Sequence, residues 1–182
     1  MYMKICFYGA ASKEIKPEYT EEAYKLGEEL VKRGHELVFG GGENGMMGAV
    51  SKGALDNDGS VLGIAPSWID EFDTLENNCT SFIYTETMDE RKNFFLMNSD
   101  AFIIAPGGIG TLDEFFEAIT LKALNQHDKK IVIFNCHHFY DKMNETFMHM
   151  AEEGVIKRDF NDLFKVETTV EGVLDYLESE ED

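Results

Sequence analysis

Basic residues are scarce in this sequence. Its 182 residues include 16 lysines and arginines against 35 aspartates and glutamates, which gives a formal net charge of −19 at pH 7. Proteins that hold a nucleic-acid backbone or an anionic lipid surface use clusters of basic side chains for that purpose. We therefore expect neither nucleic acid nor a membrane as a partner. A small anionic ligand would need donors arranged locally, because the field of the whole chain repels it.

Long apolar runs, a signal peptide and paired cysteines are absent as well. No apolar stretch approaches the roughly 20 residues that span a membrane, and the N-terminus lacks the basic segment and apolar region of a signal peptide. The three cysteines, Cys6, Cys79 and Cys136, have no C-x-x-C spacing, which predicts buried thiols in a reducing compartment. The five histidines have no metal-ligand spacing, so we expect no metal site. These features predict a soluble, cytoplasmic protein.

Apolar segments alternate with helical segments along the whole chain. The expected strands are residues 3–8, 37–39, 61–65, 82–84, 101–104 and 131–134, and the apolar segment 163–166 precedes a last expected helix that ends at about residue 177. This alternation is typical of an α/β fold with a mostly parallel sheet and helices on both faces. The length and the hydrophobic fraction of 43% fit a single domain over residues 1–182, with a frayed acidic tail from about residue 178.

The most informative stretch follows the expected strand 101–104. Residues 105–114 read APGGIGTLDE and lead into an expected helix over residues 115–124. Glycines let the backbone approach a ligand closely, and the N–H groups of a helix N-terminus favour an anion. A turn that merely needs glycine to join a strand to a helix would have a similar sequence. The stretch is neither a P-loop nor a dinucleotide fingerprint, because the Gly-Lys-Ser/Thr of one and the third glycine of the other are missing.

Two further glycine-containing turns follow expected strands. One begins at Gly9, and the other spans residues 40–48 and opens a helix. The carboxyl ends of the strands in a parallel sheet lie at one edge, where ligands bind at the topological switch point. We therefore expect these turns and the turn at Pro106 to converge on one crevice.

The expected helix 88–98 has two cations on an otherwise apolar face. At about 100° per residue, its side chains Met88, Arg91, Lys92 and Phe95 lie on one side. Long basic side chains on a surface helix can reach solvent while their stems cover apolar neighbours. Alternatively, both cations point into a walled cleft and meet an anion. The pattern alone leaves both interpretations open.

The helix after the glycine turn is apolar on two sides. Its expected core stripe consists of Leu112, Phe115, Phe116, Ile119 and Ala123. Glu114 points roughly the opposite way, toward Ala118 and Leu121. A helix that is apolar nearly all round is usually buried, and a partner subunit would cover the second face. Glu114 is then either a solvated carboxylate near a helix start or a carboxylate sheltered beside a dimer interface.

Three segments together resemble the LONELY GUY (LOG) family. Residues 106–114 fit its P-G-G-x-G-T-x-x-E motif, residues 88–92 look like its M-x-x-R-K segment, and residues 40–48 resemble its G-G-G-x-x-G-L-M-G loop. The similarity extends from about residue 4 to about residue 140. LOG proteins are cytokinin-activating phosphoribohydrolases that are often labelled lysine decarboxylases by mistake. Because paired motifs recur at the expected distance, chance is a poor explanation.

The resemblance implies a Rossmann-like, doubly wound fold, at least a homodimer, and no metal or organic cofactor. The implied reaction is hydrolysis of the N-glycosidic bond of a nucleoside 5′-monophosphate, AMP or an N6-modified AMP, to a free base and ribose 5-phosphate. Arg91 and Glu114 would be the catalytic pair. The implied substrate-binding residues are Gly9, Gly41, Gly42, Gly45, Met88, Lys92, Gly107, Gly108, Ile109, Gly110, Thr111 and Thr120.

This chemistry suits the residues. Glycoside cleavage passes through an oxocarbenium-like state, which a carboxylate such as Glu114 stabilises while it orients or deprotonates water. Arg91 retains its proton, so its role would be hydrogen bonding and charge stabilisation. The turn at residues 107–111 would hold the 5′-phosphate and thereby fix the ribose against Glu114.

At three places the chain departs from the family pattern. Residues 10–12 read AAS where Ser-Ser usually follows the first glycine, so a first-loop hydroxyl is absent or displaced. Leu121 stands where plant members have tryptophan, and Lys130 stands where proline is usual. These departures leave the preferred base open.

Two rival functions remain to be weighed against hydrolysis. A non-catalytic carrier of a nucleotide or of the molybdenum cofactor would have no need of a carboxylate near a sugar, so Arg91 and Glu114 favour the enzyme. An amino-acid decarboxylase would need a lysine that forms a Schiff base with pyridoxal phosphate. No lysine in the sequence is placed to suggest that role.

Overall fold

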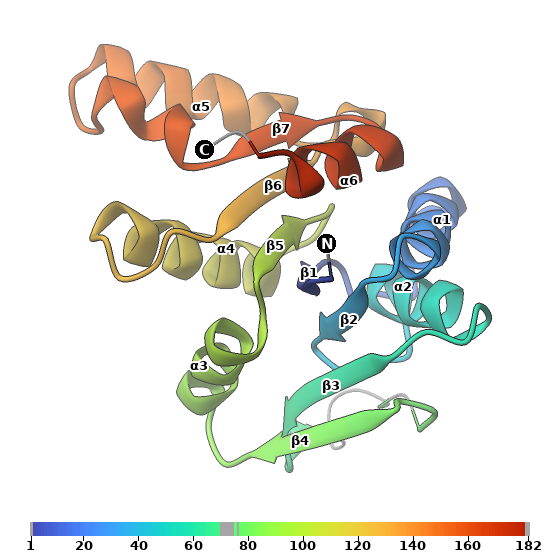
Figure 1. Cartoon of the computed structure of the whole chain (residues 1–182). Helices are drawn as coiled ribbons and strands as arrows, with labels where there is room; N and C mark the ends of the chain where they lie inside the picture. Colours follow the sequence, from blue (N-terminus) through green and yellow to red (C-terminus); the bar gives the residue numbers. More distant parts are fainter. Residues whose placement is uncertain (1, 70–74, 76, 181–182) are drawn as a thin grey trace.

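A parallel β-sheet forms the centre of the computed structural model, which describes residues 2–69, 75 and 77–180 (Figure 1). The seven strands within this part are β1 (Lys4–Tyr8), β2 (Glu36–Phe39), β3 (Val61–Pro66), β4 (Ser81–Thr85), β5 (Ala101–Ile104), β6 (Lys130–Phe134) and β7 (Lys165–Glu167). Its six α-helices are α1 (Pro17–Lys32), α2 (Gly45–Leu55), α3 (Met88–Asn98), α4 (Ile109–Ala123), α5 (Asp141–Glu152) and α6 (Val170–Glu178). Two 3₁₀ turns, η2 (Cys136–His138) and η3 (Arg158–Leu163), flank α5. The predicted alternation of strands and helices is confirmed.

The strand order places a switch point in the middle of the sheet. The order is β4-β3-β2-β1-β5-β6-β7, and every neighbouring pair is parallel. From β1 the chain moves outward to β4 and then returns to β5, which pairs with the free side of β1 through Phe7 and Ile103. This doubly wound order is the Rossmann-like arrangement predicted from the sequence, and the loops after β1 and β5 separate at its switch point.

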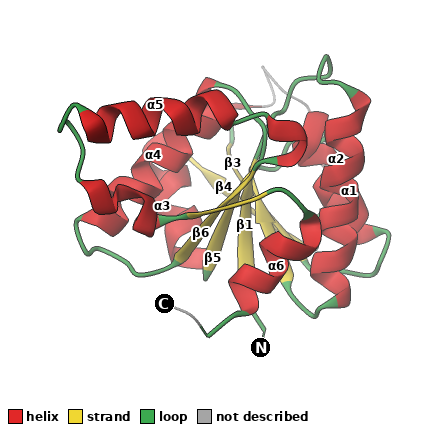
Figure 2. Cartoon of the chain, turned by 90° about the horizontal axis from the view of Figure 1, so that it is seen from above, coloured by secondary structure: helices red, strands yellow, loops and turns green. Residues whose placement is uncertain are grey.

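Helices cover both faces of the sheet (Figure 2). Helices α1, α2 and α6 pack on one face, against side chains such as Phe7 and Phe39. Helices α3, α4 and α5 cover the other face, where Tyr8 and Phe102 lie. Successive side chains of a strand point to opposite faces, so strands covered on both sides read as continuous apolar runs. The four buried residues of β5 are an example.

The sequence predicted that the three cysteines are buried thiols. Cys6 and Cys136 are buried and Cys79 is half-buried, which is the usual environment of small apolar side chains.

None of the helices among the described residues is long and apolar enough to cross a bilayer.

Helix α4 begins earlier, and packs on a different stripe, than the sequence indicated. Gly108 is its N-cap, so the second half of the glycine stretch already belongs to the helix. Its buried residues are Thr111, Phe115, Ala118 and Ile119. Phe116 and Ala123 of the expected core stripe are exposed, because Ala118 faces the sheet in place of Phe116. Relative to the expected orientation, α4 is therefore turned about its own axis. This orientation places Glu114 at the edge of the buried stripe, where its own subunit shelters it.

Two consecutive lysines at the start of β6 fasten helices on opposite faces of the sheet. Lys129 Nζ donates to the carbonyl oxygen of Ser99, 2.6 Å away at the end of α3. Lys130 Nζ donates to the carbonyl oxygens of Tyr176 and Ser179, 3.1 and 2.6 Å away at the end of α6. A cation at a helix C-terminus satisfies free carbonyl groups and complements the helix dipole. Lys130 therefore has a structural role where the family pattern has proline.

Charged side chains hold the end of α6, which lies within one residue of the helix end expected from the sequence. Glu178 is the last residue of α6, and its two carboxylate oxygens lie 2.9 Å from Arg33 Nη1 and 2.8 Å from His35 Nε2. Partial burial raises the pKa of Glu178, but the hydrogen bonds from His35 and Arg33 outweigh this and lower the pKa overall. The sequence pattern shows only an acidic ending, because its partners lie more than 140 positions earlier. Residues 181–182 lie outside the described part of the chain.

Candidate active site

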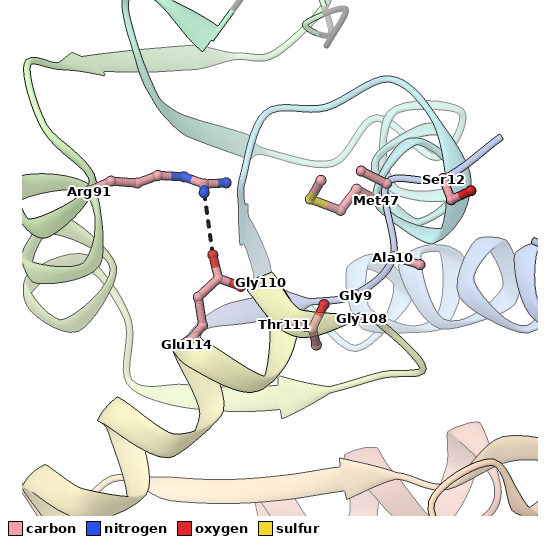
Figure 3. A pocket seen from close by; sticks show the side chains of 10 residues that line it. Gly9, Ala10, Ser12, Met47, Arg91, Gly108, Gly110, Thr111 and Glu114 are labelled. Carbon is pink, nitrogen blue, oxygen red and sulfur yellow. Dashed lines mark ion pairs between the residues drawn. The ribbon is translucent and has the colours of Figure 1, made fainter. Parts of the chain in front are cut away.

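A cavity of about 300 Å³ lies at the switch point, where the sequence predicted a crevice (Figure 3). It is lined by Gly9, Ala10, Ala11, Ser12, Met47, Arg91, Gly108, Gly110, Thr111 and Glu114. These residues come from the turn after β1, from the first turns of α2 and α3, and from the N-terminal part of α4. The three glycine turns therefore do converge, although Met47 alone represents the second one in the cavity lining.

The N-terminus of α4 opens toward this cavity. Its N-cap, Gly108, has extended backbone and supplies no capping side chain. The first N–H groups of a helix have no partners within the helix, and here Gly108, Gly110 and Thr111 line the cavity. A Cβ atom on Gly107 would collide with the Thr111 side chain, so the turn also requires glycine for steric reasons. The arrangement suits an anion, and a phosphate group in particular.

The N-terminus of α2, in contrast, is occupied by the chain itself. The N–H groups of Met46 and Met47 donate to the carbonyl oxygen of Ala10, at 2.8 and 3.2 Å. Ala10 N–H donates in turn to the Pro106 carbonyl oxygen at 3.0 Å. A Cβ atom on Gly45, whose φ is +61°, would collide with the Ala10 carbonyl oxygen. Backbone hydrogen bonds thus join the three turns, and of the helices α2 and α4 it is α4 that presents an open N-terminus to the cavity.

Gly41 and Gly42 shape the second turn from outside the cavity lining. Gly41 has a φ of +80°, which favours glycine, and a Cβ atom there would collide with the ring of Phe82. Gly42 forms a single antiparallel bridge with Leu75. Like Gly45, they hold the backbone in place and do not line the cavity, in contrast to the substrate-binding role implied by the resemblance.

Arg91 is held by a carbonyl group of β3, by the carbonyl group of the residue that follows β2, and by a carboxylate. Its Nε donates to the Ile64 carbonyl oxygen at 3.1 Å, and its Nη2 donates to the Gly40 carbonyl oxygen at 3.2 Å. Nη1 lies 3.4 Å from Glu114 Oε1, and Figure 3 shows the two side chains directed toward each other. The guanidinium also lies over the Phe95 ring, 5.1 Å from its centroid. Of the two interpretations left open, the walled cleft is correct for Arg91.

Glu114 is a buried carboxyl group with an unusual proton affinity. Its side chain is 11% exposed. Burial raises the pKa of Glu114 to about 7, and the nearby Arg91 guanidinium limits that rise. The interpretation of Glu114 as a solvated carboxylate is therefore wrong. A carboxyl group with this pKa can exchange a proton at neutral pH, which is the property of a general base or acid.

Lys92 points away from the cavity although it neighbours Arg91. Its Nζ lies 3.3 Å from Asp113 and 2.5 Å from Glu117, both on α4. These hydrogen bonds raise the pKa of Lys92. Lys92 is absent from the cavity lining, in contrast to the substrate contact implied by the resemblance. It connects α3 to α4 and so supports the pair formed by Arg91 and Glu114.

Three other predicted substrate contacts also lie outside the cavity lining. Met88 is half-buried in the first turn of α3, and Ile109 is 85% exposed at the start of α4. Thr120 is exposed and lies on a separate apolar groove between α4 and α5, together with Phe116 and Phe147. Gly107 is likewise absent from the lining. Of the predicted substrate-binding residues, the cavity therefore brings together Gly9, Gly108, Gly110 and Thr111, beside the catalytic candidates Arg91 and Glu114.

Four lining residues were not predicted as site residues. Ala10, Ala11 and Ser12 belong to the turn after β1, and Met47 belongs to the glycine-rich segment 40–48. Ser12 Oγ accepts a hydrogen bond from the Glu14 N–H at 3.2 Å. The first-loop hydroxyl is thus displaced and not absent. The glycine patterns pointed to both segments, but not to the side chains within them that reach the cavity.

The fold and the cavity define a Rossmann-like α/β protein with an open helix N-terminus beside a buried arginine–glutamate pair. Residues 47–177 match a family described as "Possible lysine decarboxylase". The cytokinin riboside 5′-monophosphate phosphoribohydrolase LOG3 of Arabidopsis thaliana is 33% identical over 177 residues, which are 97% of this chain and 82% of that protein. LOG of Oryza sativa, with the same enzyme name, is 38% identical over 159 residues, 87% of this chain and 65% of that protein. The chain belongs to the LOG family, as its motifs indicated.

Solved structures with different names share this fold. The molybdenum cofactor binding protein of Rippkaea orientalis superposes with a TM-score of 0.71 at 24% identity, over 96% of this chain and 94% of that one. A Moco carrier protein from Chlamydomonas reinhardtii gives a TM-score of 0.70 at 23% identity, over the same shares. At these identities the similarity shows the fold alone.

Proposed function

We propose that this protein hydrolyses the N-glycosidic bond of a nucleoside 5′-monophosphate to give a free base and ribose 5-phosphate. One observation carries the proposal: an open helix N-terminus and a buried Glu114–Arg91 pair lie in the same cavity. The helix N-terminus suits the 5′-phosphate, and the carboxyl group suits glycoside cleavage. The names of the relatives, which are phosphoribohydrolases of cytokinin riboside 5′-monophosphates, support the same reaction.

The reaction follows from these roles. The N–H groups at Gly108 to Thr111 bind the phosphate and place the ribose beside Glu114. Ionised Glu114 accepts a proton from water while the water oxygen bonds to the anomeric carbon. The bond from that carbon to the base nitrogen breaks, and the base leaves with the electron pair and takes up a proton from solvent. Glu114 then releases to solvent the proton that it took from water, which restores its ionised form. Arg91 orients the Glu114 carboxylate and, through its charge, favours the ionised form.

Two alternatives have weaker support. A carrier of a nucleotide or of the molybdenum cofactor would leave the Glu114–Arg91 pair without a chemical task. A decarboxylase that uses pyridoxal phosphate needs a lysine in the cavity, and none of the described residues that line it is a lysine. The hydrolase is therefore the function that the site supports best.

The test is incubation of the purified protein with AMP and with N6-isopentenyl-AMP, followed by assay of free base and ribose 5-phosphate. Release of base and sugar phosphate in equal amounts supports the hydrolase, and the relative rates rank the two bases. Binding of nucleotide by calorimetry without any release from either compound would favour the carrier.

The activity is expected to rise with pH around neutrality. Glu114 acts in its ionised form, and burial raises its pKa to about 7. Below that pH, most molecules of the protein carry a protonated Glu114 and are therefore inactive. kcat/KM for AMP should therefore increase through a midpoint near pH 7 and level off above it. Steady-state rates from about pH 5 to about pH 9 would measure this midpoint. A profile centred near the ordinary glutamate pKa would contradict the assignment of Glu114 as the base.

We further propose that the protein forms a homodimer through the α4 side of the molecule. Phe116 and Leu124 are 41% and 62% exposed on the apolar groove that also contains Thr120. Thr120, a substrate contact according to the resemblance, does not line the cavity of its own subunit and would contact substrate only from a partner. Light scattering coupled to gel filtration should give twice the chain mass of 20.7 kDa. A monomer at micromolar concentration would contradict this proposal.

A further inference from the structure

The hydroxyl group of Tyr140 lies behind the glycine turn that opens α4. Tyr140 is buried between η2 and α5 and is absent from the cavity lining. Its O–H donates to the Ala105 carbonyl oxygen at 2.8 Å. The Gly107 backbone lies near the same hydroxyl and acts to lower the Tyr140 pKa against the larger effect of burial. One side chain from the segment after η2 thus binds the backbone before Pro106 and contacts the backbone after it.

The backbone of Tyr140 is itself fixed. Its N–H group donates to Asn135 Oδ1 at 2.7 Å, and Asn135 Nδ2 donates to Asp141 Oδ1 at 2.7 Å. Asn135 N–H donates to the carbonyl oxygen of Glu167, the last residue of β7, at 2.7 Å. Tyr140 therefore occupies a position set by the neighbouring strands and not by the glycine turn that it contacts.

The turn that Tyr140 holds carries the donors of the anion site. Gly107 precedes the N-cap Gly108, so the Tyr140 hydroxyl, bound to Ala105 and close to Gly107, restrains the backbone that leads into α4. On the other side, the Pro106 carbonyl oxygen accepts from Ala10 N–H at 3.0 Å. The glycine turn is consequently held between the turn after β1 and the hydroxyl of Tyr140. Donors that are fixed before a ligand arrives bind it more tightly, because less entropy is lost on binding.

We propose that Tyr140 is a positioning residue for the anion site, and that its hydroxyl orients the residue 105–107 turn so that the first N–H groups of α4 converge on a phosphate. This role rests on the proposed binding of a 5′-phosphate but not on catalysis. Burial raises the pKa of Tyr140 well above its usual value, so the hydroxyl stays protonated and the restraint persists at every pH at which the protein works.

The test is Tyr140→Phe, which keeps the ring and removes the hydroxyl. Titration with inorganic phosphate and with ribose 5-phosphate should show both dissociation constants about tenfold higher, the size expected for a lost buried hydrogen bond. Tyr24→Phe is the matched control, since its hydroxyl donates to Asp56 at 3.0 Å on the surface away from the cavity. The control should bind both ligands as the unmodified protein does.

Amide hydrogen exchange separates positioning from a general loss of stability. In Tyr140→Phe the Gly107 amide should exchange faster, while the amides of β1 and β5 keep their protection. If phosphate affinity and Gly107 exchange are both unchanged, or if the unmodified protein binds no phosphate, the inference is wrong.

Asn135→Asp is the second variant, to be used if Tyr140→Phe does not fold. It keeps the acceptor for Tyr140 N–H but loses the bond to Asp141. It should still raise both dissociation constants, and unchanged values would overturn the inference. Because these readouts need no turnover, they hold even if the hydrolase proposal fails.

Discussion

Replacing Glu114 by glutamine should remove most of the turnover, with kcat lower by about 10² to 10⁴, the range of a lost general base. The amide has nearly the same shape, but it cannot accept a proton from water or carry the charge that stabilises an oxocarbenium-like state. Nucleotide binding should change little, because the phosphate is held by the N-terminus of α4. Comparison of kcat from steady-state assays with the dissociation constant from calorimetry would measure the two effects separately.

Asp113→Asn is the matched control for this variant. Asp113 neighbours Glu114 on α4, but its side chain is 58% exposed and does not line the cavity. The control should turn over at a rate close to that of the unmodified protein. Since the Asp113 charge raises the pKa of Glu114, its removal should move the pH midpoint slightly downward. Comparable activity of Glu114→Gln and Asp113→Asn would contradict the catalytic role of Glu114.

The part of this molecule that could be predicted from sequence is the part that local patterns encode. Runs of apolar residues predicted the strands, because a strand covered on both faces has no polar side. The turn at residues 106–111 predicted an anion site, because glycine and a helix start have direct consequences for backbone geometry. The alternation of strands and helices then placed three turns at one edge of the sheet, and the cavity lies there.

The directions of individual side chains could not be predicted, because they depend on distant partners. Arg91 and Lys92 share a helix face in projection, yet one bonds the carbonyl oxygens of Ile64 and Gly40 and the other pairs with α4. The buried stripe of α4 is set by how the helix lies across the sheet, so the apolar character of Phe116 did not decide its burial. Helical periodicity cannot distinguish these cases, since it contains no information about neighbouring elements.

Replacing Arg91 by lysine should also lower kcat strongly, because Arg91 donates hydrogen bonds to two backbone carbonyl oxygens. In Arg91→Lys the positive charge remains, but a single ammonium group replaces three nitrogens that face Ile64 O, Gly40 O and Glu114 Oε1. The shorter, rounder head group cannot meet all three, so the Glu114 carboxylate loses its orientation. We expect kcat to fall by about 10²-fold, comparable with removal of one preorganised donor.

The pH dependence of kcat/KM would show whether Arg91→Lys acts through the ion pair between Arg91 and Glu114. The Arg91 charge lowers the pKa of Glu114, so a weaker contact in Arg91→Lys should move the midpoint of kcat/KM to higher pH. Arg33→Lys makes the same substitution in an ion pair with Asp175 and Glu178, remote from the cavity, and should leave both kcat and the midpoint unchanged. An Arg91→Lys enzyme with unaltered kcat and midpoint would mean that charge alone suffices. The hydrogen bonds to the Gly40 and Ile64 carbonyl oxygens would then serve the fold and not the reaction. A fall in kcat with an upward shift of the midpoint would mean that these two carbonyl groups hold the guanidinium in place, so that the buried Glu114 carboxyl group can ionise near neutral pH.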